Sequence, residues 1–209
     1  GCGRGSTLPR GALGEPVSHI SRADVCLMTK IDQAAEGSCD YIRKTVHHYN
    51  PKAQIFESIH QPRCFIPLSD WYVNIAGEGI DVSLMKGKRI MAVSAIGNPA
   101  SFEQTLSDIG AVIVESLRYP DHHDYTMSEM ADVFQQAENV GVEAIVITEK
   151  DAVKIPADVA REKWSIPVYV ICVEVTFQQE AETFKDMLRK RLAERLGSRE
   201  KEEKGSIES

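Results

Sequence analysis

Two adjacent histidines between two aspartates form the most reactive stretch of the sequence, YPDHHDY at residues 119–125. Imidazole and carboxylate groups suit metal binding or acid–base chemistry, and the same groups also occur in solvated turns. Adjacent side chains of an extended segment point to opposite faces, so two such rings rarely bind one ion, and a metal site is the least favoured hypothesis. Two other hypotheses are favoured over it: a helix-entry loop with hydrogen-bonded histidines, or a site where one histidine orients a catalytic carboxylate or phosphate while Asp121 fixes its tautomer.

Two further stretches carry groups that can meet an anion. In AIGNP, residues 95–99, a glycine turn precedes a helix that starts with proline, so its backbone N–H groups and Asn98 can face a phosphate, or the stretch is only a tight turn. In TEKD, residues 148–151, Lys150 lies between two acids. It is either part of a surface salt-bridge set or a cation that reaches a phosphate.

A fourth stretch, TKID, has the TKxD form with which P-loop GTPases read guanine, and its candidate nucleotide contacts are Thr29, Lys30 and Asp32. A GTPase also needs GxxxxGK[ST] to hold the phosphates, and the sequence contains no such segment. Guanine reading is therefore disfavoured, and the chain as given shows no complete triphosphate site.

The elements that must position these groups follow from the apolar pattern. Short apolar runs that end in polar residues predict strands, and 3.6-residue periodicity between caps and glycines predicts helices. The predicted strands lie in residues 23–29, 53–58, 89–95, 111–119, 142–148 and 166–177, and the predicted helices in 38–49, 99–109, 126–140 and 179–197. Ser38 and either Thr126 or Ser128 are the expected helix caps, and residues 60–71 are expected to form an extended connector or a hairpin.

Alternating strands and helices predict an α/β fold, a mostly parallel sheet with helices on both faces. Ligands of such sheets bind beyond the carboxyl ends of the strands. The AIGNP, YPDHHDY and TEKD stretches all follow predicted strands, so we expect them to converge in one crevice.

Composition excludes several classes of protein. The 209-residue chain has a formal net charge of −7, which argues against a nucleic-acid partner. Its five cysteines are scattered without a CxxC pair, as in proteins of reducing compartments, and no apolar run of about 18 residues predicts a membrane span. The chain opens on a glycine-rich segment without methionine, so we expect that its first residue is not the first residue of the gene product.

Five stretches in order resemble the tetraacyldisaccharide 4'-kinases, the lipid A kinases. GCGRGSTLPRGALGEP is similar to their G-x-G-N-G-x-L-L-P-x-G-P-L-R-E-P, and RADVCLMTK to the strand that follows it. AVSAIGNPASFEQTLSDIGA resembles A-G-I-G-N-P-x-x-F-x-x-x-L-x-x-x-G, YPDHHDYT resembles F-x-D-H-H-x-Y, and ITEKDAVKI resembles T-E-K-D-A-V-K. The resemblance covers about residues 1–177.

The resemblance implies transfer of the ATP γ-phosphate, with Mg²⁺, to the 4'-hydroxyl of a tetraacyl-disaccharide 1-phosphate in lipid A biosynthesis. It implies that the full-length enzyme is a peripheral protein of the cytoplasmic face of the bacterial inner membrane and that the fragment itself is soluble. It also implies two α/β/α lobes, the second P-loop-kinase-like, and a two-stranded linker. We accordingly expect the remainder of the nucleotide-binding lobe in residues 1–52, the linker in 53–87, the C-terminal lobe in 88–197 and a disordered tail in 198–209.

Two departures limit the resemblance. The P-loop half of the first lobe is absent, and with it the catalytic lysine, the Mg²⁺ ligands and the aspartate base, so the ATP and Mg²⁺ sites are expected mainly outside this chain and the chain is expected to be inactive alone. The family's L-R-E-P reads LGEP here, so Gly14 replaces an arginine that helps to hold phosphate, while Glu15 still matches.

The resemblance also assigns roles. A histidine of the D-H-H segment reaches the catalytic carboxylate of the first lobe, and we expect His122 before His123, with Asp121 beside them. Glu15, Asn98 and Lys150 are the expected substrate or phosphate contacts. Two alternatives remain: a non-catalytic α/β module that binds a phosphorylated glycolipid or a partner protein, and a histidine-centred metalloenzyme.

Overall fold

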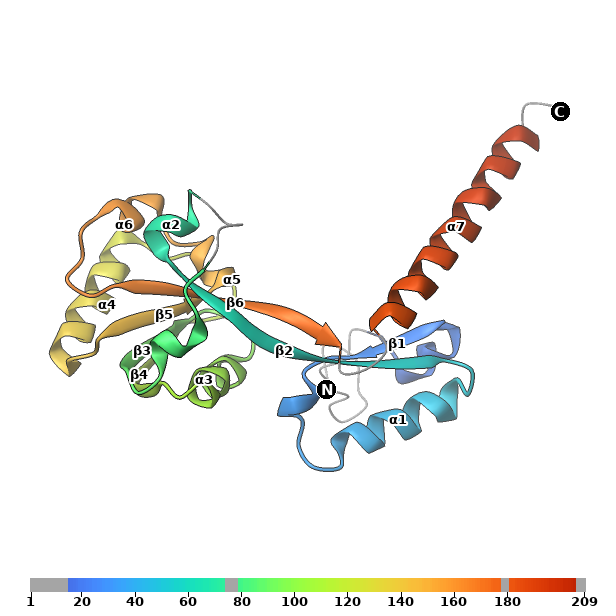
Figure 1. The fold of residues 1–209 in the computed structure, drawn as a ribbon, viewed down its shortest axis with the longest axis horizontal. Coiled ribbons are helices and arrows are strands. Elements are labelled where there is room, and N and C mark those ends of the chain that lie inside the picture. The colour runs from blue at the N-terminus through green and yellow to red at the C-terminus, as the bar shows by residue number, and fades with distance from the viewer. Residues whose placement is uncertain (1–14, 74–78, 178–180, 206–209) are drawn as a thin grey trace. The chain divides into compact units, whose positions relative to one another are not determined.

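The chain divides into two compact units in the computed structural model, in which residues 15–73, 79–177 and 181–205 are described, with side chains up to Ala193. Unit 1 comprises Gly1–His60 and Val175–Ser209, and unit 2 comprises Gln61–Glu174. Both boundaries fall inside strands, β2 (Gln54–Pro67) and β6 (Val168–Phe177), which are long in Figure 1. Because β2 and β6 are neighbours in the sheet order, the chain enters and leaves unit 2 on adjacent strands.

Unit 2 contains a parallel sheet. Strand β3 (Arg89–Ser94) pairs in parallel with β4 (Val112–Arg118) on one side and with β5 (Ala144–Thr148) on the other, and β5 pairs in parallel with β6. The full order is β1-β2-β6-β5-β3-β4. The mostly parallel sheet predicted from the sequence is therefore confirmed.

The sheet of unit 2 is buried on both faces because β3 and β5 are continuous apolar runs. Alternate residues face opposite sides, so Met91 and Val93 belong to one hydrophobic cluster while Ile90 and Ala92 belong to the other. The first cluster is completed by α2 (Leu68–Trp71), α4 (Met127–Val140) and α6 (Ala157–Arg161), and the second by α3 (Pro99–Asp108) and the 3₁₀ turn η4 (Val82–Met85). Helices on both faces were expected, and the fold confirms them.

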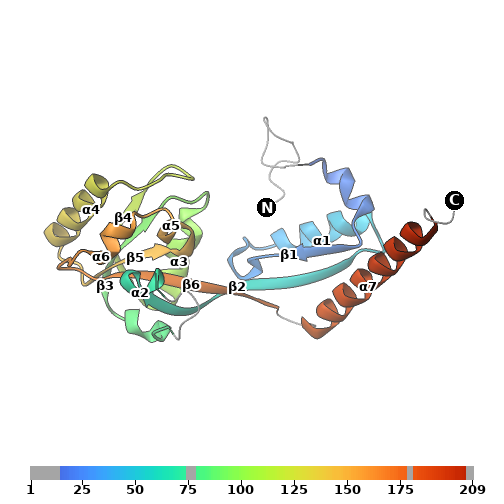
Figure 2. The same ribbon diagram turned by 90° about the horizontal axis from the view of Figure 1, so that it is seen from above.

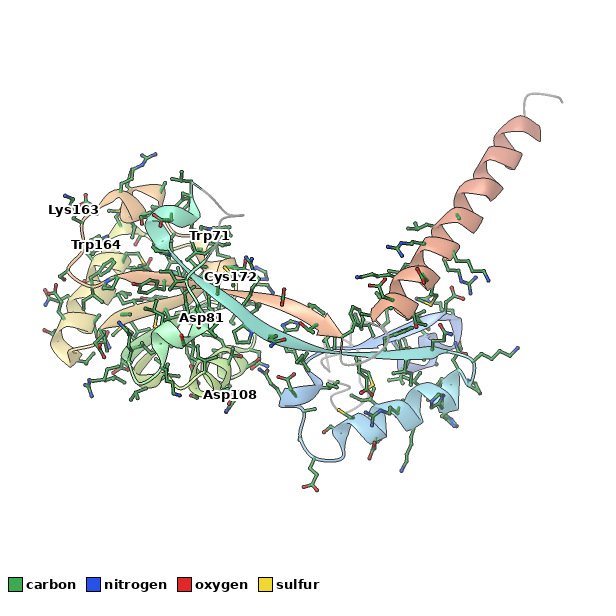
Figure 3. The ribbon with its side chains drawn as sticks, in the orientation of Figure 1. Trp71, Asp81, Asp108, Lys163, Trp164 and Cys172 are labelled. Carbon is green, nitrogen blue, oxygen red and sulfur yellow. The ribbon has the colours of Figure 1, made fainter. Side chains whose placement is uncertain are left out.

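Aromatic packing adds to the first cluster. Trp164 stacks on Phe134 of α4 with ring centroids 3.9 Å apart and donates its indole N–H to the carbonyl of Val159 at 2.8 Å. Figure 3 labels Trp164 and Trp71, the two tryptophans of the chain, and both belong to unit 2.

The two long helices of unit 2 begin where the sequence predicted them. Asn98 caps α3 by accepting from the Ser101 N–H at 3.2 Å, and Pro99 occupies the first turn. Thr126 and Glu129 form a capping box at the start of α4, so Thr126 rather than Ser128 is the cap. Gly141 ends α4 with φ +67°, a backbone conformation that glycine adopts without strain.

Unit 1 is built on the parallel pair β1 (Val25–Met28) and the first part of β2. Figure 2 shows α1 (Ser38–Tyr49) and α7 (Ala181–Gly205) on opposite sides of this pair. Ser38, the predicted cap of α1, is instead its first residue, because Gly37 takes the cap position without a side-chain hydrogen bond. Short 3₁₀ turns, η2 (Val17–Arg22) and η3 (Ile31–Gln33), precede and follow β1.

Two features differ from the predicted boundaries. Strand β2 is continuous through Pro62, where the sequence suggested a strand followed by a separate connector or hairpin. Helix α7 groups with unit 1 because Phe184 packs against Phe56 and Phe177, with ring centroids 4.9 and 4.8 Å apart. The helix also continues past residue 197, where we expected a disordered tail, and residues 206–209 lie outside the described part.

Candidate functional site

Three of the predicted stretches come together at one edge of the unit 2 sheet. Strands β5, β3 and β4 are parallel neighbours, so the segments that follow them leave from the same edge. Direct contacts join these segments: the His122 N–H donates to the Ala95 carbonyl at 3.3 Å, and the Tyr125 hydroxyl donates to Asp151 at 3.2 Å. We call this edge, formed by residues 95–98, 119–125 and 148–151, the strand-end site.

His122 is held by its backbone while its ring stays in solvent. Its φ is +65°, in the left-handed region that a histidine seldom adopts. Its N–H also lies 3.0 Å from Oδ1 of Asp121, and its side chain is 87% exposed. Nε2 of His122 lies 3.8 Å from Oδ2 of Asp121, longer than a hydrogen bond, so Asp121 acts on the ring as a nearby charge and on the loop through the backbone.

The His123 side chain is packed among neighbouring residues, whereas that of His122 is exposed. Its ring stacks on Tyr119 at 5.0 Å and meets Tyr125 edge to face at 5.4 Å. Nε2 lies 3.0 Å from Oε1 of Glu129 without the angle of a good hydrogen bond, so this contact is an ion pair when the ring is protonated. Hydrogen bonds from the backbone and side chain of Thr126, and then the proximity of His123, hold the pKa of Glu129 below its usual value.

The AIGNP turn already has an anion beside it. A Cβ added to Gly97 would lie 3.1 Å from Oδ2 of Asp121, so this carboxylate reaches the glycine backbone at the start of α3. The Asn98 side chain, a predicted phosphate contact, accepts from the Ser101 N–H as the helix cap. A phosphate at this turn would share the space with Asp121.

The TEKD stretch begins the short helix α5 (Glu149–Ala152), and its members point to different surroundings. Lys150 is exposed, and Glu149 accepts from the Val173 N–H at 3.3 Å. Asp151 is fully buried and accepts from the Ala95 N–H at 2.8 Å and the Thr148 hydroxyl at 2.6 Å. The sequence pattern indicated Asp151 only as one of two acids beside Lys150, although a threonine three residues before an aspartate is the spacing of a capped helix start.

Burial, charge and hydrogen bonding shift the pKa values of Tyr125, Glu103 and Arg118, which lie in or beside the strand-end site. Burial, and next the Asp151 charge, raise the pKa of the Tyr125 phenol, so it stays a hydrogen-bond donor. Arg118 at the end of β4 makes a two-bond contact to Glu103 of α3, at 2.7 and 2.6 Å, which lowers the pKa of Glu103 and raises that of Arg118.

The predicted nucleotide contacts lie in unit 1, directly after β1. Thr29 and Asp32 are exposed, and Lys30 has a left-handed backbone, φ +55°, at the start of η3. Glu15 accepts a hydrogen bond from His19 at 3.1 Å and another from Arg22, and these contacts, that of His19 first, lower its pKa. The structure thus groups Asp121, His122, His123, Asn98 and Lys150 in unit 2, and Glu15, Thr29, Lys30 and Asp32 in unit 1.

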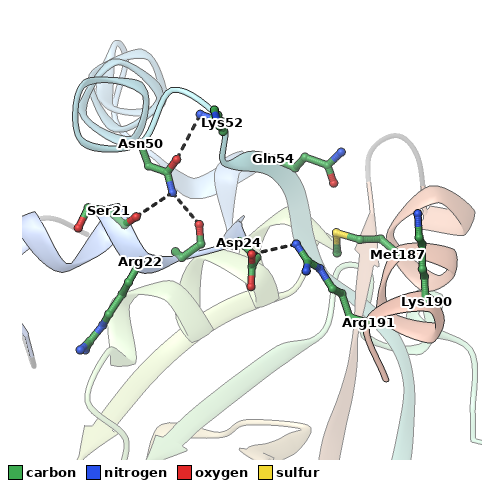
Figure 4. A pocket seen from close by; sticks show the side chains of 10 residues that line it. Ser21, Arg22, Asp24, Asn50, Lys52, Gln54, Met187, Lys190 and Arg191 are labelled. Carbon is green, nitrogen blue, oxygen red and sulfur yellow. Dashed lines mark hydrogen bonds and ion pairs between the residues drawn. The ribbon is translucent and has the colours of Figure 1, made fainter. Parts of the chain in front are cut away.

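Unit 1 also has a pocket of about 600 Å³, shown in Figure 4. It is lined by Ser21, Arg22, Ala23, Asp24, Asn50, Lys52, Gln54, Met187, Lys190 and Arg191. Asn50 fixes one wall by donating to the Ala23 carbonyl at 2.7 Å, and Arg191 pairs with Asp24 at 2.9 Å. The pocket lies at the amino ends of β1 and β2, away from Thr29, and no predicted site residue lines it.

Metal binding and membrane crossing find no support in the part of the chain that the structure describes. Across residues 15–73, 79–177 and 181–193, whose side chains are described, no three His, Cys, Asp or Glu side chains gather as a metal site. None of the helices within these ranges is both long and apolar enough to cross a membrane.

Comparisons with known proteins agree with one another. A family profile described as tetraacyldisaccharide-1-P 4'-kinase matches residues 1–193. The tetraacyldisaccharide 4'-kinase of Syntrophus aciditrophicus is 35% identical over 179 residues, 83% of this chain and 46% of that protein. The enzyme of the same name from Halothermothrix orenii is 29% identical over 181 residues, 84% of this chain and 47% of that protein.

The fold is also similar to a solved structure. LpxK from Aquifex aeolicus, crystallised in complex with ATP, superposes with a TM-score of 0.52 at 21% identity, over 89% of this chain and 48% of that one. At this identity the likeness concerns the fold alone, an α/β type. The chain spans about half the length of the relatives it matches.

Proposed function

The chain belongs to the tetraacyldisaccharide-1-P 4'-kinase family, and from that premise we propose that it is the later part of such an enzyme. The whole protein transfers the γ-phosphate of ATP, with Mg²⁺, to the 4'-hydroxyl of a tetraacyl-disaccharide 1-phosphate. Residues 15–60 contribute to the nucleotide-binding lobe, and unit 2 is the lobe that meets the acceptor. The chain by itself is inactive, because it has no GxxxxGK[ST] segment.

The main support for this proposal is that the His122 ring is exposed while its backbone is fixed. Its ring is 87% exposed while its backbone is held in a left-handed conformation at the strand-end site. Neighbouring His123 is enclosed by two tyrosines and Glu129. The two histidines therefore differ in role: His122 meets the reacting groups, and His123 shapes the loop.

In the proposed mechanism, His122 supports removal of the proton from the sugar hydroxyl. Phosphoryl transfer depends mostly on positioning and on neutralising charge, so a histidine fixed at the mouth of a site is useful there. The imidazole contacts the carboxylate that serves as base, which lies outside the described residues. Lys150, an exposed residue of the same strand-end site, contacts a phosphate group. Asn98 and Glu15 are further candidate substrate or phosphate contacts.

No three His, Cys, Asp or Glu side chains gather in the described residues, and we place the Mg²⁺ ligands mainly outside the described ranges, as the family resemblance implies. Thr29, Lys30 and Asp32 follow β1 at its carboxyl end, where a nucleotide binds in sheets of this type. These three residues are candidate contacts to the base of ATP. They do not form a phosphate-binding loop for the triphosphate.

The substrate carries four acyl chains, so the whole enzyme works at a membrane surface, and we propose the cytoplasmic face of the inner membrane. The net charge of −7 argues against a nucleic acid as partner. Flotation of the complete gene product with phospholipid vesicles tests this location; protein that stays at the bottom of the gradient contradicts it.

Replacement of His122 tests the mechanism. In the complete gene product, His122→Asn removes the imidazole and retains a side chain that tolerates a left-handed backbone. We expect turnover to fall about 100-fold or more, the usual contribution of acid–base assistance, with little change in stability. The control is His47→Ala, which removes an exposed histidine from α1. Full turnover in the His122 variant would refute the assigned role.

The reading frame before Gly1 decides between this enzyme and the non-catalytic binding module. A continuous upstream segment with GxxxxGK[ST] supports the kinase. A start codon close to Gly1 supports the module that binds a phosphorylated glycolipid or a partner protein.

A further inference from the structure

A buried carboxylate that no part of the proposed mechanism uses lies directly beneath the strand-end site. Asp151 is 0% exposed, although aspartate is one of the residue types that are almost never fully buried without partners. Because no solvent reaches this carboxylate, it cannot contact the sugar or the phosphate. Its role must pass through the groups that it binds.

Those groups come from three different segments. Oδ1 accepts from the Ala95 N–H at 2.8 Å and from the Tyr125 hydroxyl at 3.2 Å, and Oδ2 accepts from the Thr148 hydroxyl at 2.6 Å. Ala95 follows β3, Tyr125 lies in the segment after β4, and Thr148 ends β5. One side chain therefore ties together the carboxyl ends of three neighbouring strands.

Two of these partners also hold the loop of His122. Ala95, whose N–H binds Asp151, accepts from the His122 N–H through its carbonyl at 3.3 Å. Tyr125 contacts the ring of His123 and, at 5.2 Å, that of Tyr119, so it fixes the loop on the far side of His122. Asp151 thus acts on residues before and after the strained backbone at His122.

We propose that Asp151 is a positioning residue, which sets the place of the His122 imidazole by joining Ala95, Tyr125 and Thr148. This inference rests on the proposed function only for the consequence in catalysis. A carboxylate suits the position because all three partners donate, and hydrogen bonds to a charged acceptor are stronger and more directional than neutral ones. A misplacement of about 1 Å at a reacting group can lower a rate about 100-fold.

The test of positioning needs no activity. In the 209-residue chain, Asp151→Ala should speed amide hydrogen exchange at His122 and Ala95 about 10-fold or more and shift the ring signals of His122 in NMR spectra. Asp151→Asn keeps one oxygen for Ala95 and should give a smaller change at both amides. The matched control is Leu106→Ala, which opens a cavity in α3 at a fully buried residue without touching Asp151.

Two results would overturn the proposal. One is a folded Asp151→Ala protein in which the His122 amide and ring signals stay unchanged. The other is the same His122 response in Leu106→Ala, which would show general loosening of unit 2. If Asp151→Ala does not fold, the Asp151→Asn protein decides by the same signals, and no change there contradicts the proposal.

Turnover of the complete gene product separates this inference from the proposed function. Asp151→Asn should lower kcat about 10-fold or more while the KM for ATP stays within about twofold. If His122→Asn keeps full turnover while Asp151 variants still move the His122 signals, the kinase role of His122 fails and the positioning role stands. If Asp151→Asn moves the His122 signals and kcat is unchanged, the catalytic consequence is wrong.

Discussion

The two units are stabilised in different ways, and the difference indicates where precise chemistry can be placed. Both hydrophobic clusters described above belong to unit 2. Within the described part of unit 1, the buried side chains are only Met28, Val46, Ala53, Phe56 and Ser58. Unit 2 can therefore hold a strained loop at its edge, because a rigid core and a buried carboxylate fix the strand ends beneath it.

The strand ends themselves show the same contrast. In unit 2 the segments after β3, β4 and β5 meet on Asp151. In unit 1 the segment after β1 is a 3₁₀ turn with exposed Thr29 and Asp32. A preorganised edge suits a group that must be placed precisely, and an exposed one suits a contact that further protein or ligand completes.

The largest expected effect is the loss of core packing in unit 2. Ile145→Ala should lower the free energy of unfolding of this unit by about 2–5 kcal/mol, because a fully buried side chain leaves a cavity. Tryptophan fluorescence measures it selectively, since Trp71 and Trp164 both lie in unit 2. In unit 1, Leu27→Ala should change stability by about 0.5 kcal/mol or less, because this side chain is 43% exposed. Equal losses would break the comparison.

A smaller effect tests whether the strand ends act as one network. Thr148→Val and Tyr125→Phe each remove one donor to Asp151 and should each cost about 1–2 kcal/mol. Both bonds end on one carboxylate. The loss of unfolding free energy in the double variant, measured by urea unfolding, should therefore differ from the sum of the two single losses by at least about 0.5 kcal/mol. Strict additivity would mean that the contacts are independent.

Helix starts should differ between the units as well. Thr126→Ala removes the capping box of α4 and should cost about 1 kcal/mol, measured by denaturant unfolding followed by tryptophan fluorescence. Ser38→Ala at the start of α1 should leave the free energy of unfolding almost unchanged, because no side-chain hydrogen bond caps that helix. Denaturant unfolding followed by far-UV circular dichroism measures it. A cost at Ser38 as large as at Thr126 would contradict this difference.

The smallest effect concerns two carboxylates with lowered pKa values. Glu129 owes its low pKa first to the Thr126 N–H, and Glu15 owes its low pKa to the hydrogen bond from His19 and then to Arg22. Both stabilise the fold above their ordinary pKa of 4.5, and this stability is lost as the pH falls through the lowered values. Added salt should raise the Glu15 pKa, in NMR titration, more than that of Glu129, because it screens exposed charges. A reversed order would contradict this assignment.

Much of unit 2 can be predicted from the sequence because its signals are local. The apolar run of β3, the proline start of α3 and the Thr126–Glu129 spacing of α4 each specify an element without distant partners. Parallel topology then brings the strand ends together, which is why the convergence of AIGNP, YPDHHDY and TEKD could be expected.

What the sequence does not specify arises from contacts between distant segments. The burial of Asp151 depends on donors from residues 95 and 125 as well as from nearby Thr148, and no spacing reveals the two distant donors. The exposure of His122 depends on its left-handed backbone, and the enclosure of His123 depends on two tyrosine rings. The packing of α7 on unit 1 depends on Phe56, far away in the chain. Apolar periodicity and helix caps are local signals, so they cannot predict such long-range contacts.

The entry and exit of unit 2 through neighbouring strands have a consequence for biosynthesis. Residues 61–174 form an uninterrupted stretch, so this unit can complete its core while the ribosome is still adding the residues that follow. Unit 1 must wait, because Phe184 reaches Phe56 only after the whole inserted stretch has been translated. During that interval β1 and the first part of β2 remain without α7.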